Sequence, residues 1–370
     1  MRSKSDILLV GQTPPPYHGQ AVMTAMLYDY EWDDLKVEKI RMGFSDEVSS
    51  VGKASIGKVF HLISLIFQTW FVVFRKSPKV LYYLPASPNL TPVIRDFIYL
   101  ASVRWLFPKT VFHYHAGGLD QYIEGKSWLK KLTKWVYNGA DVSIDVNVTN
   151  PPSGEYFHAK KNVVVMNGLD VKSMVVDRGE GRFKVISVGL LCEEKGSLEL
   201  VKTAQKLKQQ GHDCIWHVVG GWESEVFKEE MMKLIDELEV SDQIKFLGVL
   251  NGDSKWEAYA EADGFVFLSH HPTETFGLVL IEAMGMGLPI ITTKWRGIPH
   301  VVGESNAAIL CDIKSPDQFS SAIAELISAP DQQSIMSENA VKYYQEHFTR
   351  AKFIESIESE FKKLVIEPKK

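Results

Sequence analysis

Short apolar runs alternate with longer helical patterns along almost the whole chain, and this alternation constrains the fold more than any other feature. The runs expected to be strands are Ile7–Gly11, Val80–Leu84, Thr110–His115, Val142–Asp145 and Val163–Met166 in the first half, and Lys184–Leu191, Cys214–Val219, Ile244–Leu247, Gly264–Leu268 and Pro289–Thr293 in the second. Continuous apolar strands separated by helices are typical of buried parallel sheets built from strand–helix–strand units. We therefore predict an α/β chain with two doubly wound parallel sheets.

The length of 370 residues is sufficient for two domains of ordinary size. Hydrophobic periodicity is lost over Asp170–Arg182, where charge and glycine accumulate, so we place the boundary in this segment. We expect one Rossmann-like domain over residues 1–175 and a second over residues 182–350. A helical stretch at residues 353–365 follows the second domain and is a candidate to pack back onto the first.

Composition and charge exclude several classes of protein. A chain with 45% hydrophobic and 24% charged residues is neither fibrous nor disordered. Its three cysteines are widely spaced and form no Cys-x-x-Cys unit, so we expect no disulfide framework or cysteine zinc site, and a reducing, cytoplasmic location. Residues 1–175 carry 20 Lys and Arg against 15 Asp and Glu, whereas residues 176–370 carry 21 against 31. This asymmetry indicates two domains with different partners, unless it reflects chance variation between solvated surfaces.

The start of the chain and one internal segment raise the question of membranes. Ile7–Gly11 is too short an apolar run for a signal peptide and is expected to be a strand. Val59–Phe74 is apolar and has basic flanks, but it is shorter than the roughly 20 residues of a spanning helix. Its polar residues share one narrow helical stripe: His61, Ser64 and Gln68. We expect a helix buried on most sides, and the alternative is a helix that lies at an anionic membrane interface.

The most informative run extends from Phe267 to Val302. We expect a strand to end near Leu268, a polar loop to follow, and a helix to begin near Phe276. That helix is apolar at nearly every position except Glu282, and an unpaired buried carboxylate is very unfavourable. Glu282 therefore either pairs with a core Lys or Arg, or reaches an open site and accepts hydrogen bonds from ligand hydroxyls.

A second glutamate, Glu274, lies in the loop before this helix. Between the two glutamates, the backbone N–H groups of Phe276, Gly277 and Leu278 are expected at the positive end of the helix dipole. Such an end suits an anion, for example a diphosphate.

From Glu274 to Ile291 the chain has the sequence E-T-F-G-L-V-L-I-E-A-M-G-M-G-L-P-I-I. Here it resembles the retaining glycosyltransferases of family 4 (group 1), whose signature is E-x-F-G-x-x-x-x-E-A-M-A-x-G-x-P-V-I. Further segments are similar to the family's in the family's order: GQTPPPYHGQA (11–21), HYHAGGL (113–119), VVMNGLD (164–170) and VISVGLLCEEKGSLELVKTAQKL (185–207). The resemblance implies the GT-B fold, in which two Rossmann-like domains face a cleft. It also implies transfer of a sugar from a UDP- or GDP-sugar to a hydroxyl acceptor.

The resemblance assigns roles to individual residues. Glu274 is expected to contact the transferred sugar, and Lys195 is expected to hold the departing diphosphate with the Phe276–Leu278 amides. Glu282 is expected to bind the ribose hydroxyls. His115 is expected beneath the donor sugar, although without this context it is more typical of a packed histidine at a strand end. The remaining expected contacts are Gly220 and Gly221 near the nucleotide, Gly248 and Val249 in the base-contacting loop, and Gly19 and Gln20 on the acceptor side.

Three positions depart from the family pattern. Leu190 stands where the family usually has Arg, Arg296 stands where it has the first Gly of G-G-I-P-E, and His300 stands where it has the Glu of that segment. We hypothesise that Arg296 or an arginine of the linker partly replaces the lost positive charge. The departures leave three alternatives: a weakened or inactive member of the family, a nucleotide-sugar binding protein without turnover, and a sugar-nucleotide epimerase with a GT-B-like fold.

Neither a metal nor a bound cofactor is expected. The chain contains no Asp-x-Asp pair and no G-x-G-x-x-G, and His113 and His115 have no third zinc ligand at motif spacing. We expect metal-independent transfer in which Lys195 and helix amides take the place of a cation. The expected partners are a nucleotide-sugar donor and a glycan or lipid-linked acceptor of surface-polysaccharide synthesis (O-antigen, capsule or exopolysaccharide), with peripheral contact to the inner membrane face. No nucleic acid is expected.

Overall fold

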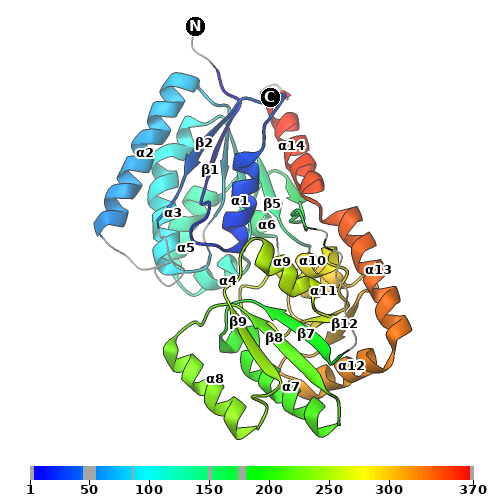
Figure 1. The fold of residues 1–370 in the computed structure, drawn as a ribbon. Helices are drawn as coiled ribbons and strands as arrows, with labels where there is room; N and C mark the ends of the chain where they lie inside the picture. The colour runs from blue at the N-terminus through cyan, green and yellow to red at the C-terminus, as the bar shows by residue number, and fades with distance from the viewer. Residues whose placement is uncertain are drawn as a thin grey trace. The chain divides into compact units, whose positions relative to one another are not determined.

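The computed structural model describes residues 4–44, 56–85, 87–148, 152–172, 174 and 181–366. The chain divides into two compact units. Unit 1 comprises Met1–Gly168 together with Arg350–Lys370, and unit 2 comprises Leu169–Thr349. Each unit contains one six-stranded sheet (Figure 1). Much of the predicted linker Asp170–Arg182 lies outside the described residues.

Unit 1 is a parallel sheet with the strand order β2-β1-β3-β4-β5-β6. Its strands are β1 (Ile7–Gly11), β2 (Val37–Arg41), β3 (Val80–Tyr83), β4 (Lys109–Tyr114), β5 (Val142–Asp145) and β6 (Asn162–Val164). Its helices are α1 (Gly19–Asp29), α2 (Ile56–Lys76), α3 (Leu90–Val103), η2 (Arg104–Leu106), α4 (Leu119–Glu124), α5 (Ser127–Tyr137), α6 (Ser153–Tyr156) and α14 (Arg350–Ile366). Strands β1, β3 and β5 are buried along their whole length; β1 and β3 are accordingly apolar throughout, whereas β5 also buries Ser143 and Asp145.

Unit 2 is a second parallel sheet with the order β12-β11-β10-β7-β8-β9. Its strands are β7 (Phe183–Val188), β8 (Cys214–Val219), β9 (Ile244–Gly248), β10 (Gly264–Phe267), β11 (Ile290–Thr293) and β12 (Ala308–Cys311). Its helices are η3 (Glu193–Lys195), α7 (Ser197–Gln209), α8 (Glu225–Glu237), α9 (Asp253–Ala260), α10 (Leu278–Gly285), α11 (Ile298–Val302), α12 (Pro316–Ser328) and α13 (Pro330–His347). The predicted fold class, two doubly wound parallel sheets, is confirmed.

The strand order identifies the switch point of each sheet, where the next strand is added on the opposite side of the first one. In unit 2 the first strand, β7, lies between β8 and β10, so the loops after β7 and β10 leave the sheet in opposite directions. In unit 1 the corresponding point lies between β1 and β3. Ligands of open α/β sheets bind at such switch points, outside the carboxyl ends of the strands.

The strand predictions were incomplete at the sheet edges. Strands β2 and β12 were not predicted, and each lies at the edge of its sheet. β2 pairs only with β1 and is half-exposed, so its sequence VEKIR lacks the apolar run of a central strand. The strand predicted over Lys184–Leu191 ends at Val188, because the chain turns at Gly189, whose φ is +159°.

The prediction that the apolar helix is buried on most sides was wrong. α2 is longer than expected and buries only Leu62, Leu65 and Thr69. Its most apolar window is 17% buried, and by length and composition it could cross a membrane. The exposed face of α2 is wider than the polar stripe. Ser64 and Gln68 are exposed, and so are the large apolar residues beside them.

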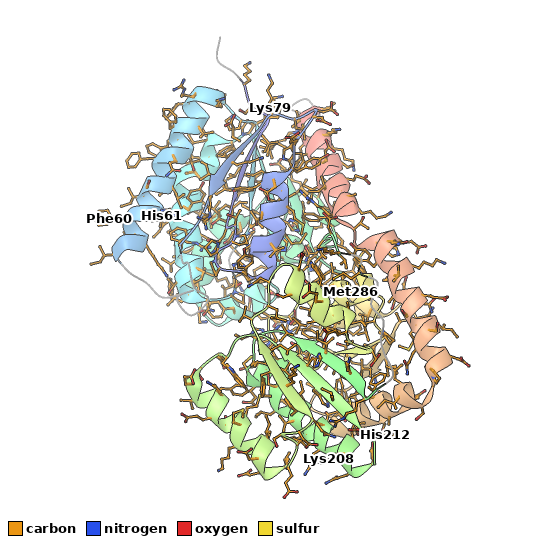
Figure 2. The ribbon with its side chains drawn as sticks, viewed as in Figure 1. Phe60, His61, Lys79, Lys208, His212 and Met286 are labelled. Atoms are coloured by element: carbon orange, nitrogen blue, oxygen red, sulfur yellow. The ribbon has the colours of Figure 1, made fainter. Side chains whose placement is uncertain are left out.

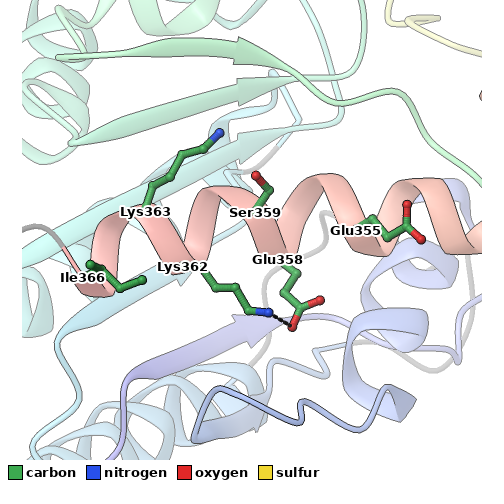
Figure 3. A pocket seen from close by; sticks show the side chains of 6 residues that line it. All are labelled: Glu355, Glu358, Ser359, Lys362, Lys363 and Ile366. Atoms are coloured by element: carbon green, nitrogen blue, oxygen red, sulfur yellow. Dashed lines mark ion pairs between the residues drawn. The ribbon is translucent and has the colours of Figure 1, made fainter.

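Helix α14 is part of unit 1 and packs on its sheet. Lys109 Nζ donates to the Leu364 carbonyl at 2.7 Å, and the Phe361 ring lies 5.3 Å from that of Tyr82. A surface depression of about 570 Å³ lies along this helix and is lined by residues of α14 alone: Glu355, Glu358, Ser359, Lys362, Lys363 and Ile366. Figure 3 shows the Lys362–Glu358 ion pair on this surface. Because a single helix lines it, this depression is not an enclosed site.

Candidate functional site

The switch point of unit 2 brings Lys195 and Glu274 together. Lys195 ends η3, which follows β7, and Glu274 lies in the loop after β10. Lys195 Nζ is 2.5 Å from Glu274 Oε2, and Ser269 Oγ donates to the same oxygen at 3.1 Å. The Lys195 side chain is 25% exposed and that of Glu274 is 10% exposed. The pair is thus shielded from most solvent but accessible to a ligand.

Two glycines are required to shape this end of the sheet. Gly196 has φ +77°, and a Cβ there would lie 2.5 Å from the Leu268 carbonyl oxygen. Gly220, after β8, lies so close to the Gly189 backbone that a Cβ would be 1.7 Å from the Gly189 oxygen. A side chain at either position would push the loops apart, so glycine maintains the backbone against which Lys195 is placed.

Helix α10 begins two residues later than predicted. Gly277 is its N-cap with φ +73°, and the first helical residue is Leu278. Phe276 lies before the cap, and its buried ring is 5.8 Å from that of Phe348. Because the first N–H groups of a helix lack intrahelical acceptors, the amides of Leu278 and Val279 supply the positive helix end.

Glu282 is buried on α10 and has partners within unit 2. Lys255 Nζ lies 2.7 Å from Glu282 Oε1, and the Tyr259 hydroxyl donates to Oε2 at 2.9 Å. Both partners belong to α9, and burial followed by the Glu282 charge raises the pKa of Tyr259 well above its ordinary value. The structure thus shows the lysine pairing that the sequence left as one alternative, and ribose binding by Glu282 stays a prediction.

The predicted nucleotide-side residues lie at adjacent strand ends. The Gly220 amide donates to the Gly248 carbonyl at 2.8 Å, so the ends of β8 and β9 are joined. Val249 is exposed, and one of its methyl groups lies 3.3 Å from where a Cβ of Gly221 would be. The structure therefore groups Gly220, Gly221, Gly248 and Val249 in one place, as expected for a shared contact surface.

Leu190 lies beside Lys195, at the place where the family pattern has Arg. Both residues line a small cavity of about 20 Å³ at the end of β7. Arg296, the proposed replacement, has its guanidinium 5.6 Å from the Trp295 ring, and the Trp295 indole donates to the His271 carbonyl at 2.9 Å. Replacement of the lost charge by Arg296 stays a hypothesis.

Several residues of the site were not identified from the sequence. Ser269 and His271 belong to the polar loop after β10, and Lys255 and Tyr259 lie on α9. Burial, with the nearby Lys195 charge, lowers the pKa of His271. The loop residues could have been found from their position just before Glu274. Lys255, in contrast, lies 27 residues before Glu282 in the sequence and shares no motif with it.

Unit 1 places its predicted residues near the carboxyl ends of β1 and β4. His115 follows β4, and its ring centroid lies 4.2 Å from that of His113. Burial, with a smaller contribution from His18, lowers the pKa of His115 to about 3, so the ring is neutral at ordinary pH. Gly19 and Gln20 begin α1, directly after the N-cap His18. The structure therefore brings His18, Gly19, Gln20 and His115 to one end of this sheet.

One cluster among the described residues has metal-ligand spacing. The donor atoms of Cys192, Glu194 and Glu223 lie within 4.8 Å of one another. Burial is the main cause of a raised pKa for the Cys192 thiol, which disfavours the thiolate that a metal requires. The two glutamates are exposed, and exposed acidic groups are common without an ion. Metal independence stays a prediction.

The chain is similar to known proteins in sequence and in structure. Residues 172–343 match the family model of glycosyl transferases group 1. The chain is 28% identical over 228 residues to D-inositol 3-phosphate glycosyltransferase of Corynebacterium urealyticum, covering 56% of this chain and 53% of that protein. It is 30% identical over 129 residues to N-acetyl-alpha-D-glucosaminyl L-malate synthase of Bacillus anthracis, covering 35% and 33%. The matches thus span about half or less of these relatives.

Solved structures resemble the whole chain. Anabaena HepE in complex with UDP has a TM-score of 0.75 at 17% identity, covering 97% of this chain and all of that one. Sucrose-phosphate synthase from Thermosynechococcus elongatus has a TM-score of 0.73 at 16% identity, covering 97% and 99%. At these identities the likeness concerns the fold, and it confirms the two-domain α/β architecture of the GT-B type.

Proposed function

We propose that the chain transfers a sugar from a nucleotide-diphosphate sugar to a hydroxyl acceptor. The proposal takes as its premise that residues 172–343 belong to the glycosyl transferases group 1 family. The observation on which this depends most is the Lys195–Glu274 pair at the switch point of unit 2, beside the N-terminus of α10. A cation and helix amides suit a diphosphate, and a carboxylate suits sugar hydroxyls.

The relatives support a transferase that uses a nucleotide donor. Two are named as a glycosyltransferase and as a synthase that joins N-acetyl-glucosaminyl and malate groups, so their acceptors differ. Solved forms of HepE contain UDP, UDP with glucose, and UDP-glucose. A UDP-sugar is therefore the first donor to test, and a GDP-sugar the second.

In the proposed reaction, the chain holds the donor and stabilises the departing diphosphate. Negative charge develops on the diphosphate as the glycosidic bond breaks, and Lys195 with the first amides of α10 attracts that charge. Glu274 orients the transferred sugar through its hydroxyls. We propose that the anomeric configuration is retained and that the departing phosphate accepts the acceptor's proton. These groups take the place of a metal ion.

We propose a lipid-linked glycan of surface-polysaccharide synthesis as the acceptor, encountered by a cytoplasmic protein at the inner membrane face. The excess of Lys and Arg over Asp and Glu in residues 1–175 supports this choice, because a lipid diphosphate is anionic.

A donor screen tests the proposal first. A nucleotide sugar that binds the folded protein raises its melting temperature by mass action, so UDP- and GDP-sugars can be compared directly. Lys195→Ala should remove the shift, whereas Lys233→Ala, at an exposed position of α8, should keep it. An unchanged shift in Lys195→Ala would refute the placement of the diphosphate.

The stereochemistry and the metal requirement need separate measurements. Anomeric analysis of the product by NMR tests retention, and inversion would overturn the assigned mechanism. Transfer that is unaffected by EDTA would support a metal-independent site, and transfer that EDTA stops and Mg²⁺ or Mn²⁺ restores would contradict it.

A nucleotide-sugar binding protein without turnover is the second candidate. Leu190 favours it, because an exposed leucine lies beside Lys195 where a second cation would share the diphosphate. Donor binding without transfer to any of a panel of acceptors, and without donor hydrolysis, would support this candidate. Release of free epimerised sugar would instead indicate an epimerase.

A further inference from the structure

Helix α2 exposes its apolar face instead of burying it. Phe60, Phe67, Phe71 and Phe74 are between 60% and 68% exposed, and Ile56 and Ile63 lie on the same face. Because these positions recur every three, four or seven residues, they form one continuous line along the helix, here named the aromatic stripe. In Figure 1, α2 lies on the outer side of unit 1, and in Figure 2 Phe60 is on its outer surface.

The opposite face fixes α2 to the rest of unit 1. Leu62 and Leu65 are buried in the core, and Thr69 Oγ1 lies 2.7 Å from the Tyr99 hydroxyl of α3. The Trp70 indole donates to the Ser102 carbonyl at 3.0 Å. These contacts would break if the helix left unit 1 to cross a bilayer. The packed helix can therefore lie along a membrane surface, but it cannot span one.

The apolar surface continues beyond α2 onto η2. The Phe67 ring lies 5.9 Å from that of Trp70, edge to face. The indole of Trp105 in η2, which is 70% exposed, donates to the same Ser102 carbonyl as Trp70 does, at 3.1 Å. Trp105 also lines a cavity of about 340 Å³ together with Trp135 of α5, another exposed residue. Exposed tryptophans beside a phenylalanine stripe are typical of a membrane–water interface.

The helices that carry this surface are rich in cations. Helices α2 and α5 contain six Lys and Arg and no Asp or Glu: Lys58, Arg75, Lys76, Lys130, Lys131 and Lys134. Two of the six pair with carboxylates of neighbouring elements, Lys76 with Glu38 and Lys130 with Glu124. The Arg75 guanidinium lies 5.4 Å from the Phe71 ring, so a cation borders the stripe directly. A second copy of the chain, placed symmetrically on this face, would bring the same cations together and be repelled. An anionic lipid surface attracts them.

We propose that the aromatic stripe of α2, with Trp105 and the flanking cations, docks unit 1 onto an anionic phospholipid bilayer. The phenylalanines enter the boundary between head groups and acyl chains, while Arg75 and the α5 lysines contact lipid phosphates. This docking does not depend on transferase activity. If the proposed function is correct, it brings the chain to the surface where a lipid-linked acceptor is found.

Vesicle flotation of the full chain tests the proposal. Phosphatidylcholine vesicles and vesicles with about one third phosphatidylglycerol are compared at low and high salt. We expect binding to the anionic vesicles, weakened by salt. The double variant Phe67→Gln, Phe71→Gln should bind at least about tenfold more weakly, because two exposed apolar groups are lost.

Matched controls separate the stripe from general surface changes. Val226→Gln, Ile335→Gln removes two exposed apolar residues from unit 2 and should bind as the wild type does. Equal loss in both double variants, or no binding by the wild type, would overturn the proposal. Arg75→Gln with Lys131→Gln should weaken binding to anionic vesicles and reduce its salt dependence.

Two further measurements distinguish the other outcomes. In analytical ultracentrifugation, a wild-type dimer that Phe67→Gln, Phe71→Gln makes monomeric would show that a second copy covers the stripe, and would overturn lipid docking. The melting-temperature shift with nucleotide sugar should be the same in this variant and in the wild type. If the wild type binds lipid but no nucleotide sugar shifts its melting temperature, the docking proposal stands and the proposed function is wrong.

Discussion

Replacing Glu274 by Gln should strengthen binding of the nucleoside diphosphate alone and weaken transfer. In the free protein, Glu274 Oε2 lies 2.5 Å from Lys195 Nζ and accepts a hydrogen bond from Ser269 Oγ at 3.1 Å. A diphosphate that binds Lys195 must break the ion pair between Lys195 and this carboxylate. It must also lie close to the negative charge of the carboxylate. Glutamine keeps the size and hydrogen-bonding capacity of the side chain but removes the charge.

The expected gain follows from the distances and the exposure. Two like charges about 5 Å apart repel by about 3 kcal/mol at an effective dielectric constant of about 20. The Lys195 side chain is 25% exposed, so solvent screens part of this repulsion. We expect a net gain of about 1 kcal/mol, which is about fivefold in the dissociation constant. Loss of the charged contact to the sugar should cost about 1.5–3 kcal/mol in kcat/KM, which is roughly 10- to 150-fold.

Calorimetric titration with the nucleoside diphosphate identified in the donor screen measures the first effect, and an initial-rate transfer assay measures the second. Glu229→Gln, an exposed position on α8, is the matched control and should change neither. Lys195→Ala should weaken binding of the nucleoside diphosphate, which is the opposite of the effect expected for Glu274→Gln. If Glu274→Gln binds the diphosphate more weakly than the wild type, the carboxylate does not compete for Lys195 and the diphosphate binds elsewhere.

Three other changes test the stability of the two units. Lys255→Met should destabilise unit 2 by about 2–3 kcal/mol, because it leaves Glu282 buried without its cation; adding Glu282→Gln should recover part of the loss in denaturant unfolding. Gly196→Ala should lower the melting temperature, with about 3 kcal/mol or more lost, because a Cβ would lie 2.5 Å from the Leu268 carbonyl at φ +77°; unchanged stability would contradict the strained geometry. Burial raises the pKa of Asp145 from 3.8 to about 7. Between these values the folded chain holds a proton that the unfolded chain lacks, so stability should fall as pH rises from about 4 to about 7, by up to about 4 kcal/mol. Asp145→Asn should therefore gain stability relative to the wild type at pH 8 but not at pH 4, and a pH-independent difference would refute the shift.

The sequence was sufficient for the central strands of both sheets, because strands buried on both faces are predominantly apolar. It was insufficient for β2, where an edge position relaxes that requirement and three of the five residues are charged. It also gave the wrong environment for α2. Periodicity shows which residues share a helix face, but it does not show which face the neighbouring elements cover. The buried contact of Thr69 with Tyr99 comes from a helix 30 residues away, and no local pattern encodes it.

The site shows the same division between local and distant information. The motif shows that seven residues separate Glu274 from Glu282. No motif predicts which lysines pair with these two glutamates. Lys195 lies 2.5 Å from Glu274 and Lys255 lies 2.7 Å from Glu282, so both signature glutamates are neutralised by cations in the free protein. Residues 176–370 as a whole carry more Asp and Glu than Lys and Arg. On the proposed function, affinity for an anionic donor would therefore arise locally, through exchange of a lysine from carboxylate to phosphate and from the amides at the start of α10, and not from the overall charge of the unit.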